Sequence, residues 1–374
     1  MIKIGSIKKF YKAKYKWPII ITALLLVAAV SLSALYIVFR PEKPAAATTA
    51  SFSNIQDPCA DSDNLTFTCY NKELDSIVQQ DGAEKASALV KQQYGKYSYV
   101  QVQCHQLMHV IGRAALAKYD YDLAKVYTHG DHFCASGYYH GASEQIVRDK
   151  GAAYIINHAE EACKVFADKD RYSLDHYNCV HGLGHGLMEA TNNDVFKAIK
   201  VCEVFRDGWE LRSCDSGVFM QNVIIPLSPD ETADRKSKFL KTDDLMYPCD
   251  AVEEIHQWGC YVIQSSWALS QVNYDFSKVF PLCDKVRSDG LRQECFESIG
   301  RDASGMSLYK MDQTIANCNL ASTSEGKSHC FVGAAKDYVY NDHDNKRGLQ
   351  LCGNLTGDMS AECNTAVNQY YADF

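Results

Sequence analysis

The sequence lacks the short motifs that would assign it a familiar activity. It contains no phosphate-binding loop, no Gly-x-Ser-x-Gly nucleophile elbow and no Cys-x-x-Cys-His haem-attachment motif. Basic residues are also scarce beyond the start of the chain. Residues 1–43 hold eight Lys and Arg and one acid, so the total charge of −8 leaves −15 for the remainder. An acidic surface repels phosphate backbones, which argues against a nucleic-acid partner.

The chain has one long uncharged segment, residues 18–39, which follows a basic tail at residues 1–17. Its 22 positions are enough for a transmembrane helix, which needs about 20 apolar residues, whereas the core of a cleaved signal peptide is shorter. The lysines before it predict that the tail stays in the cytoplasm. We therefore expect a single-pass membrane protein whose part after Arg40 is extracellular or periplasmic. Cleavage near residues 45–47 is the alternative.

Sixteen cysteines are far more than a chain of 374 residues usually contains, and an even count outside the cytoplasm indicates disulfide bonds. Residues 40–58 are rich in Pro, Ala, Thr and Ser and predict a linker, and residues 59–374 form the cysteine-rich part. Fourteen of the cysteines fall into seven pairs that are 10 to 16 residues apart: Cys59/Cys69, Cys163/Cys179, Cys202/Cys214, Cys249/Cys260, Cys283/Cys295, Cys318/Cys330 and Cys352/Cys363.

These pairs mark a repeating unit. The first Cys of a pair ends a helix-like run, as at residues 194–202, and the second Cys opens another helix, as at residues 330–340. From Cys179 onward the second cysteines recur at intervals of 35, 46, 35, 35 and 33 residues, and a period near 35 is typical of two-helix repeats. Three residues after the helix-opening Cys, a small residue would let neighbouring helices approach closely, and four copies have glycine there: Gly137, Gly182, Gly217 and Gly333.

We therefore predict an all-α fold, in which helical hairpins are stapled by disulfides and stack into a solenoid-like array. Over most of residues 59–374 this spacing resembles that of tetratricopeptide-type proteins, including secreted cysteine-rich versions. The resemblance concerns architecture alone and assigns no functional residue.

Cys104 and Cys134 remain outside the seven pairs, and both lie in the histidine-rich part of the chain. One hypothesis is a disulfide between them, since thiols outside the cytoplasm normally pair. The other is that one or both are thiolate ligands beside His105 and His109. A disulfide requires the two Cα atoms to lie roughly 4.4–6.8 Å apart, so the structure can separate the two.

Nine of the twelve histidines lie between residues 105 and 185, and this region contains two near-copies of one phrase. The chain there reads Cys134-Ala-Ser-Gly-Tyr-Tyr-His140-Gly-Ala-Ser-Glu144 and later Cys179-Val-His181-Gly-Leu-Gly-His185-Gly-Leu-Met-Glu189. His and Glu four residues apart share one helix face, and His105 and His109 have the same spacing. In the next copy Met220 and Ile224 replace the His and Glu, so the polar pattern is confined to one region.

This pattern predicts a metal site with five candidate ligands: His105, His109, His140, His181 and His185. Imidazole ligands suit zinc, with copper or iron as alternatives. In a catalytic form Glu144 or Glu189 would act as general base. The same residues also fit a structural role, with imidazoles bonded to neighbouring carbonyls and His–Glu ion pairs that duplication has copied.

Two functions follow from these observations. The first is a binding or scaffold module that presents its surface to a peptide, protein or glycan, as solenoids do. The second is a metal-dependent enzyme of the hydrolase type that uses the His and Glu cluster.

The predicted orientation is testable with protease added outside intact cells. We expect digestion of the part of the chain after Arg40, because the basic tail holds the N-terminus inside. Detection with an antibody against the C-terminus should show loss of the full-length band. Protection of the C-terminal part until the membrane is permeabilised would contradict this topology.

Overall fold

The computed structural model describes residues 55–60, 66–167, 173–206, 208–227 and 237–372. The predicted basic tail, transmembrane segment and nearly all of the linker lie outside these residues. Among the helices that are described, none is both long enough and apolar enough to cross a membrane.

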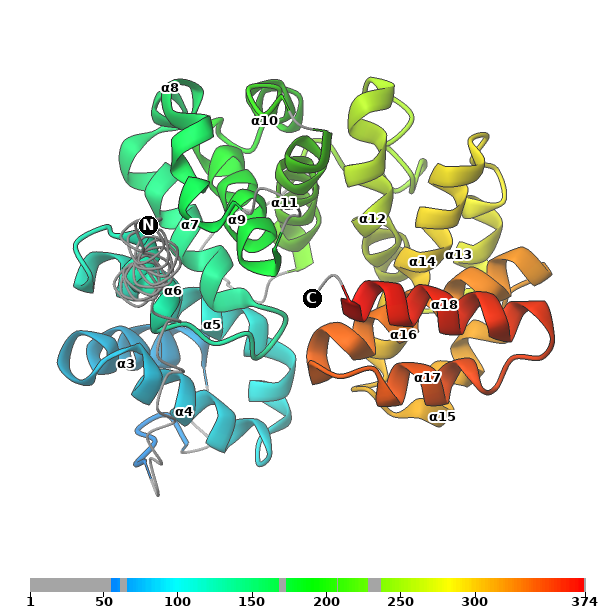
Figure 1. The fold of residues 1–374 in the computed structure, drawn as a ribbon, viewed down its shortest axis with the longest axis horizontal. Helices are drawn as coiled ribbons and strands as arrows, with labels where there is room; N and C mark the ends of the chain where they lie inside the picture. Colours follow the sequence, from blue (N-terminus) through cyan, green and yellow to red (C-terminus); the bar gives the residue numbers. More distant parts are fainter. Residues whose placement is uncertain (1–54, 61–65, 168–172, 207, 228–236, 373–374) are drawn as a thin grey trace, which may run out of the picture. The chain divides into compact units, whose positions relative to one another are not determined.

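Within the described part of the chain the fold consists of sixteen α-helices and one 3-10 helix, without any strand (Figure 1). The prediction of an all-α domain is therefore confirmed. In chain order the elements are α3 (Phe67–Asp81), α4 (Ala83–Tyr94), α5 (Ser98–Lys118), α6 (Leu123–Thr128), α7 (Gly137–Lys150), α8 (Ala152–Ala162), η1 (Lys164–Phe166), α9 (Leu174–Ala190), α10 (Val195–Cys202), α11 (Gly208–Leu227), α12 (Glu254–Gln271), α13 (Phe276–Cys283), α14 (Asp289–Met306), α15 (Met311–Cys318), α16 (Ser324–Asp342), α17 (Lys346–Cys352) and α18 (Asp358–Ala372).

Eight disulfides hold these helices together, with Cα–Cα distances between 5.3 and 5.9 Å. Seven are the pairs predicted from spacing. The eighth joins Cys104 and Cys134, whose Cα atoms lie 5.7 Å apart, so neither sulfur is a free thiolate ligand. This pattern fits an oxidising extracellular or secreted environment.

The cysteines sit on the helices in a slightly different way from the prediction. The first members Cys202, Cys283, Cys318 and Cys352 end α10, α13, α15 and α17, as expected. The second members lie well inside the following helix; Cys330, for example, is the seventh residue of α16. The helix begins before the cysteine because the segment between the two cysteines contains an N-cap residue. The Thr323 side chain accepts a hydrogen bond from the backbone N–H of Gly326, which starts α16 earlier.

The long helices α5, α7, α9, α11, α12, α14, α16 and α18 each pack against the next along the chain. Glycines permit this packing. A Cβ atom on Gly217 would overlap the backbone carbonyl of His181 on α9, and one on Gly333 would overlap the carbonyl of Glu297 on α14. The expected role of the four repeat glycines in close helix approach is thus confirmed.

The long helices line a half-open cavity of about 470 Å³. Helices from both ends of the array line it, including α5 and α9 on one side and α14, α16 and α18 on the other (Figure 1). A direct link joins the two sides, since the Tyr340 hydroxyl of α16 donates to Asn178 Oδ1 of α9 at 3.4 Å. Residues 162 positions apart therefore meet at one site.

The glycine contacts lead to a stability prediction. Replacing Gly217 by Ala should destabilise the protein by about 1–3 kcal/mol, because the added methyl group has no space against the α9 backbone. The measurement is urea unfolding with the disulfides intact. Gly305→Ala is the matched control, since this glycine near the end of α14 faces open space and Ala favours the helix by roughly 0.5–1 kcal/mol. Equal destabilisation by both substitutions would refute the packing explanation.

Candidate metal centre

Five histidine rings from three neighbouring helices meet beside the cavity. His105 and His109 come from α5, His140 from α7, and His181 and His185 from α9. Neighbouring ring centroids lie 4.5–5.8 Å apart. The structure thus brings together all five histidines that the sequence indicates as metal ligands.

His105 and His109 point their Nε2 atoms at each other across 3.0 Å. In both rings the other nitrogen, Nδ1, forms a hydrogen bond. His105 Nδ1 lies 2.9 Å from the carbonyl of Cys134, and His109 Nδ1 lies 3.1 Å from the Glu144 carboxylate. Both partners only accept hydrogen bonds, so each Nδ1 carries the proton and each Nε2 carries a lone pair.

His181 and His185 repeat this arrangement on α9, two long helices after α5, with 3.1 Å between their Nε2 atoms. His185 Nδ1 donates to Gln221 Oε1 at 2.8 Å. His181 Nδ1 lies 2.8 Å from the hydroxyl oxygen of Ser216 and 3.2 Å from that of Tyr177. Ser216 donates its own proton to the carbonyl of Ser213 and can accept from His181 Nδ1, and in that tautomer the lone pair of His181 lies on Nε2.

His140 lies between the two pairs. Its Nε2 donates to Asn178 Oδ1 at 3.1 Å, and Nδ1 is buried without a hydrogen-bond partner among the described residues. A buried acceptor without a partner is costly, so this nitrogen is available for a ligand. Each of the five rings thus presents one lone-pair nitrogen to the cluster.

Two lone pairs that face each other at 3.0 Å repel unless a positive centre lies between them. A metal ion provides one, because two nitrogens bound at about 2.0–2.1 Å to the same tetrahedral ion lie roughly 3.3–3.4 Å apart, a little more than the distance here. The ligand atoms of His105, His109 and His140 all lie within 4.8 Å of one another, and so do those of His140, His181 and His185. The geometry therefore has two potential ion positions that share His140.

The protonation state of the rings suits the same role. Burial lowers the pKa of His105 to about 4 and that of His109 to about 3. It also holds the pKa values of His140 and His181 well below the usual range and lowers that of His185. All five imidazoles are consequently neutral at pH 7, which is the form that binds metals.

Glu144 contacts the cluster through a histidine of the neighbouring helix instead of His140 on its own helix. Its carboxylate accepts from His109, from Arg113 at 3.4 Å and from Arg148 at 2.7 Å. Burial alone would raise its pKa, but these three partners hold the pKa of Glu144 well below its usual range. A carboxylate so engaged is a weak base, and its geometry fits orientation of the His109 ring.

Glu189 lies further from the imidazoles. Its carboxylate accepts from Arg148 of α7 at 2.6 Å, although His185 is one turn earlier on its own helix. Burial and the nearby Glu144 charge raise the pKa of Glu189 to about 7. Of the two predicted general bases, Glu189 is the one whose pKa suits proton transfer near neutrality.

The residues that orient the rings were not foreseen from the sequence. Met220 and Ile224 suggested that α11 contributes nothing to the site, yet its Ser216 and Gln221 fix the rings of His181 and His185. A signal did exist for Ser216, because it lies two residues after Cys214, as His181 lies two residues after Cys179. Asn178 and Tyr340 could be placed at the site only by the three-dimensional packing.

The lowered pKa of His109 gives a pH-dependent prediction for the metal-free protein. Unfolding restores a pKa near 6.5, so the unfolded chain binds a proton that the folded protein does not. The free energy of unfolding should therefore be fully developed above pH 6.5 and fall as the pH drops toward 3. His109→Gln should flatten the slope between pH 4 and 5.5 by about 1.4 kcal/mol per pH unit. Denaturant unfolding at several pH values measures this slope. Parallel plots of unfolding free energy against pH for the wild type and His109→Gln would contradict a lowered pKa of His109.

The chain was also compared with known proteins. No protein-family model, no curated protein and no solved structure matches it. Its function must therefore be inferred from the histidine centre itself.

Proposed function

We propose that this protein binds divalent transition-metal ions through His105, His109, His140, His181 and His185, with zinc as the first candidate and copper or iron next. The observation that carries the proposal is the close Nε2···Nε2 contact between His105 and His109, whose Nδ1 protons are already donated to Cys134 and Glu144, together with the same close contact between His181 and His185. Structural imidazoles would instead place a donor against an acceptor at each contact. Metal-binding imidazoles are typically held in this way by an acceptor at the remote nitrogen.

The centre borders open space. His105, His140 and His181 line the cavity of about 470 Å³, so an ion bound by them faces room for a further ligand. Structural zinc sites are closed by four protein ligands, whereas sites that act on other molecules keep one position open. This favours a metal centre that binds a ligand in the cavity. A metal-dependent hydrolase is the second candidate, supported by the open side and by the near-neutral pKa of Glu189.

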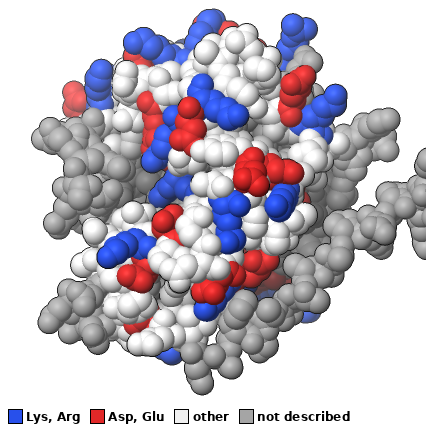
Figure 2. Space-filling model, turned by 90° about the vertical axis from the view of Figure 1, so that its left-hand side faces the viewer, with Lys and Arg blue, Asp and Glu red and all other residues white. Residues whose placement is uncertain are grey.

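The setting of this centre is part of the proposal. We infer a stack of disulfide-stapled helical hairpins of the tetratricopeptide type, anchored by a membrane helix at residues 18–39 and displayed outside the cytoplasm. A peptide, protein or glycan is a candidate partner of its outer surface. On the face drawn in Figure 2, Lys and Arg are interspersed with Asp and Glu, so this face lacks the continuous basic area that nucleic-acid binding uses.

Metal uptake is the direct test. The purified protein, stripped with a chelator and dialysed against zinc, should retain at least one ion per chain by elemental analysis. Replacing both His140 and His185 by Ala should weaken zinc binding at least 100-fold, because each triad loses a ligand. Gln221→Ala should weaken it about 10-fold or more, since the His185 ring loses its orientation.

The matched control is His158→Ala, which removes a histidine on α8 whose ring lies against Tyr154. It should leave zinc uptake unchanged. Circular dichroism shows whether each variant keeps its helices. Absence of stoichiometric metal in the wild-type protein would refute the proposal, and unfolding of the His140/His185 variant without any loss of metal by Gln221→Ala would assign the histidines a structural role.

A further inference from the structure

The cavity has a second polar wall that the metal centre does not use. It is formed by α14 and α16, across from the histidine-bearing helices (Figure 1). Five charged residues line this wall: Glu294, Glu297, Arg301, Lys336 and Asp337. Their pairing decides which charge the wall presents to a ligand.

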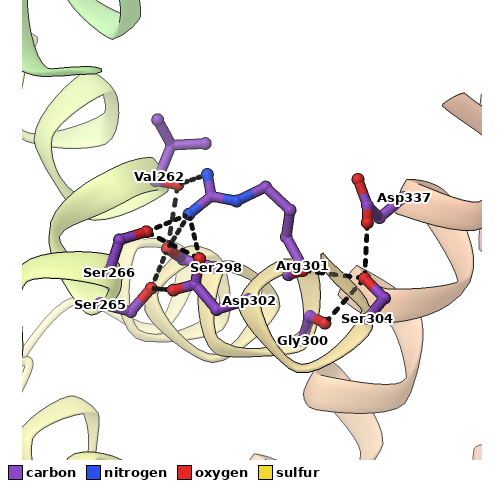
Figure 3. Close-up of polar contacts among 9 residues, drawn as sticks. All are labelled: Val262, Ser265, Ser266, Ser298, Gly300, Arg301, Asp302, Ser304 and Asp337. Carbon is purple, nitrogen blue, oxygen red and sulfur yellow. Dashed lines mark hydrogen bonds and ion pairs between the residues drawn. The ribbon is translucent and has the colours of Figure 1, made fainter. Parts of the chain in front are cut away.

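Both cations of the wall are already paired. Lys336 donates to the Glu297 carboxylate at 2.6 Å. Arg301 donates to Asp302 of its own helix at 3.1 Å, and on α12 to the hydroxyl of Ser266 at 3.2 Å and to the carbonyl of Val262 (Figure 3). Within each ion pair the positive and negative charges cancel, so neither Lys336 nor Arg301 is left without a carboxylate partner.

Two carboxyl groups remain without a bonded cation. Glu294 accepts from the indole N–H of Trp258 at 2.9 Å, and Asp337 accepts from the Ser304 hydroxyl at 2.5 Å (Figure 3). All these donors are neutral. Burial and the neighbouring Glu297 raise the pKa of Glu294 to about 7, and burial raises that of Asp337 to about 6. Both side chains are half-buried in the cavity wall, and a positively charged ligand that covers them would pair with the two carboxylates.

The rest of the lining supports a ligand of the same charge. Five aromatic side chains contribute to the cavity surface: Tyr177, Trp209, Trp258, Tyr340 and Tyr370. The negative faces of such rings attract organic cations, as in the sites that bind ammonium groups. A volume of about 470 Å³ is in the range of small-molecule sites.

We propose that the cavity binds a small organic molecule with a protonated amine, whose ammonium group lies at Glu294 and Asp337 and whose body packs against the aromatic side chains. An anionic ligand would be repelled by the two carboxylates, and a neutral one would leave them uncompensated. The proposal goes beyond the metal centre, because none of the residues that bind the amine is a metal ligand. An experiment can therefore refute the amine site without refuting the metal centre, and the reverse.

The test compares benzylamine with benzyl alcohol, which has nearly the same shape and no charge. Isothermal titration of the full-length protein at pH 8, where the Glu294 carboxyl is ionised, should show benzylamine binding at least 10-fold more tightly than the alcohol. Glu294→Gln preserves the shape of the side chain and removes its charge. It should weaken benzylamine binding about 10-fold or more and leave the weak binding of the alcohol unchanged.

Glu254→Gln is the matched control, since it removes one charge from an exposed position on α12 outside the cavity. It should bind benzylamine as the wild type does. Titrations of chelator-stripped and zinc-loaded protein separate this site from the metal centre: amine selectivity in both states supports the proposal whether or not zinc is retained. Equal affinity for the two probes, no binding of either, or an unaltered affinity in Glu294→Gln would overturn it.

Discussion

The close approach of α5, α7, α9 and α11 at glycine is the constraint on which the histidine centre depends. A Cβ atom on Gly141 would overlap the backbone of His109, and one on Gly182 would crowd His140. Because the backbones lie this close, short imidazole side chains from three helices reach one another. Larger residues at these glycines would separate the helices, and the five rings could no longer share a site.

Hydrogen bonding then decides what the cluster can bind. An imidazole has one donor and one acceptor nitrogen when it is neutral, and burial keeps these rings neutral. Cys134, Glu144, Gln221 and Asn178 each accept the proton of one ring, and Ser216 accepts that of His181 in the tautomer whose Nε2 lone pair faces inward. The Cys104–Cys134 disulfide belongs to this arrangement too, since the carbonyl that orients His105 comes from one of its cysteines.

Both sides of the cavity carry groups that accept hydrogen bonds or bear negative charge. On one side neutral rings present lone pairs, and on the other Glu294 and Asp337 lack bonded cations. Both sides therefore suit the positively charged ligands that we propose, a metal ion on the first and an ammonium group on the second. The hydrogen bond from Tyr340 to Asn178 joins the two sides of this cavity.

The sequence alone determined the helical class, the seven spaced disulfides and the five histidines, because each depends on local spacing along the chain. It also narrowed Cys104 and Cys134 to a disulfide or a pair of ligands. The tertiary structure decided the rest. It formed the Cys104–Cys134 disulfide, oriented the Glu144 carboxylate toward His109, and brought Ser216, Gln221 and Tyr340 to the site. These depend on which helices become neighbours and on how their side chains are oriented, and periodicity along one helix carries no information about an acceptor on the next.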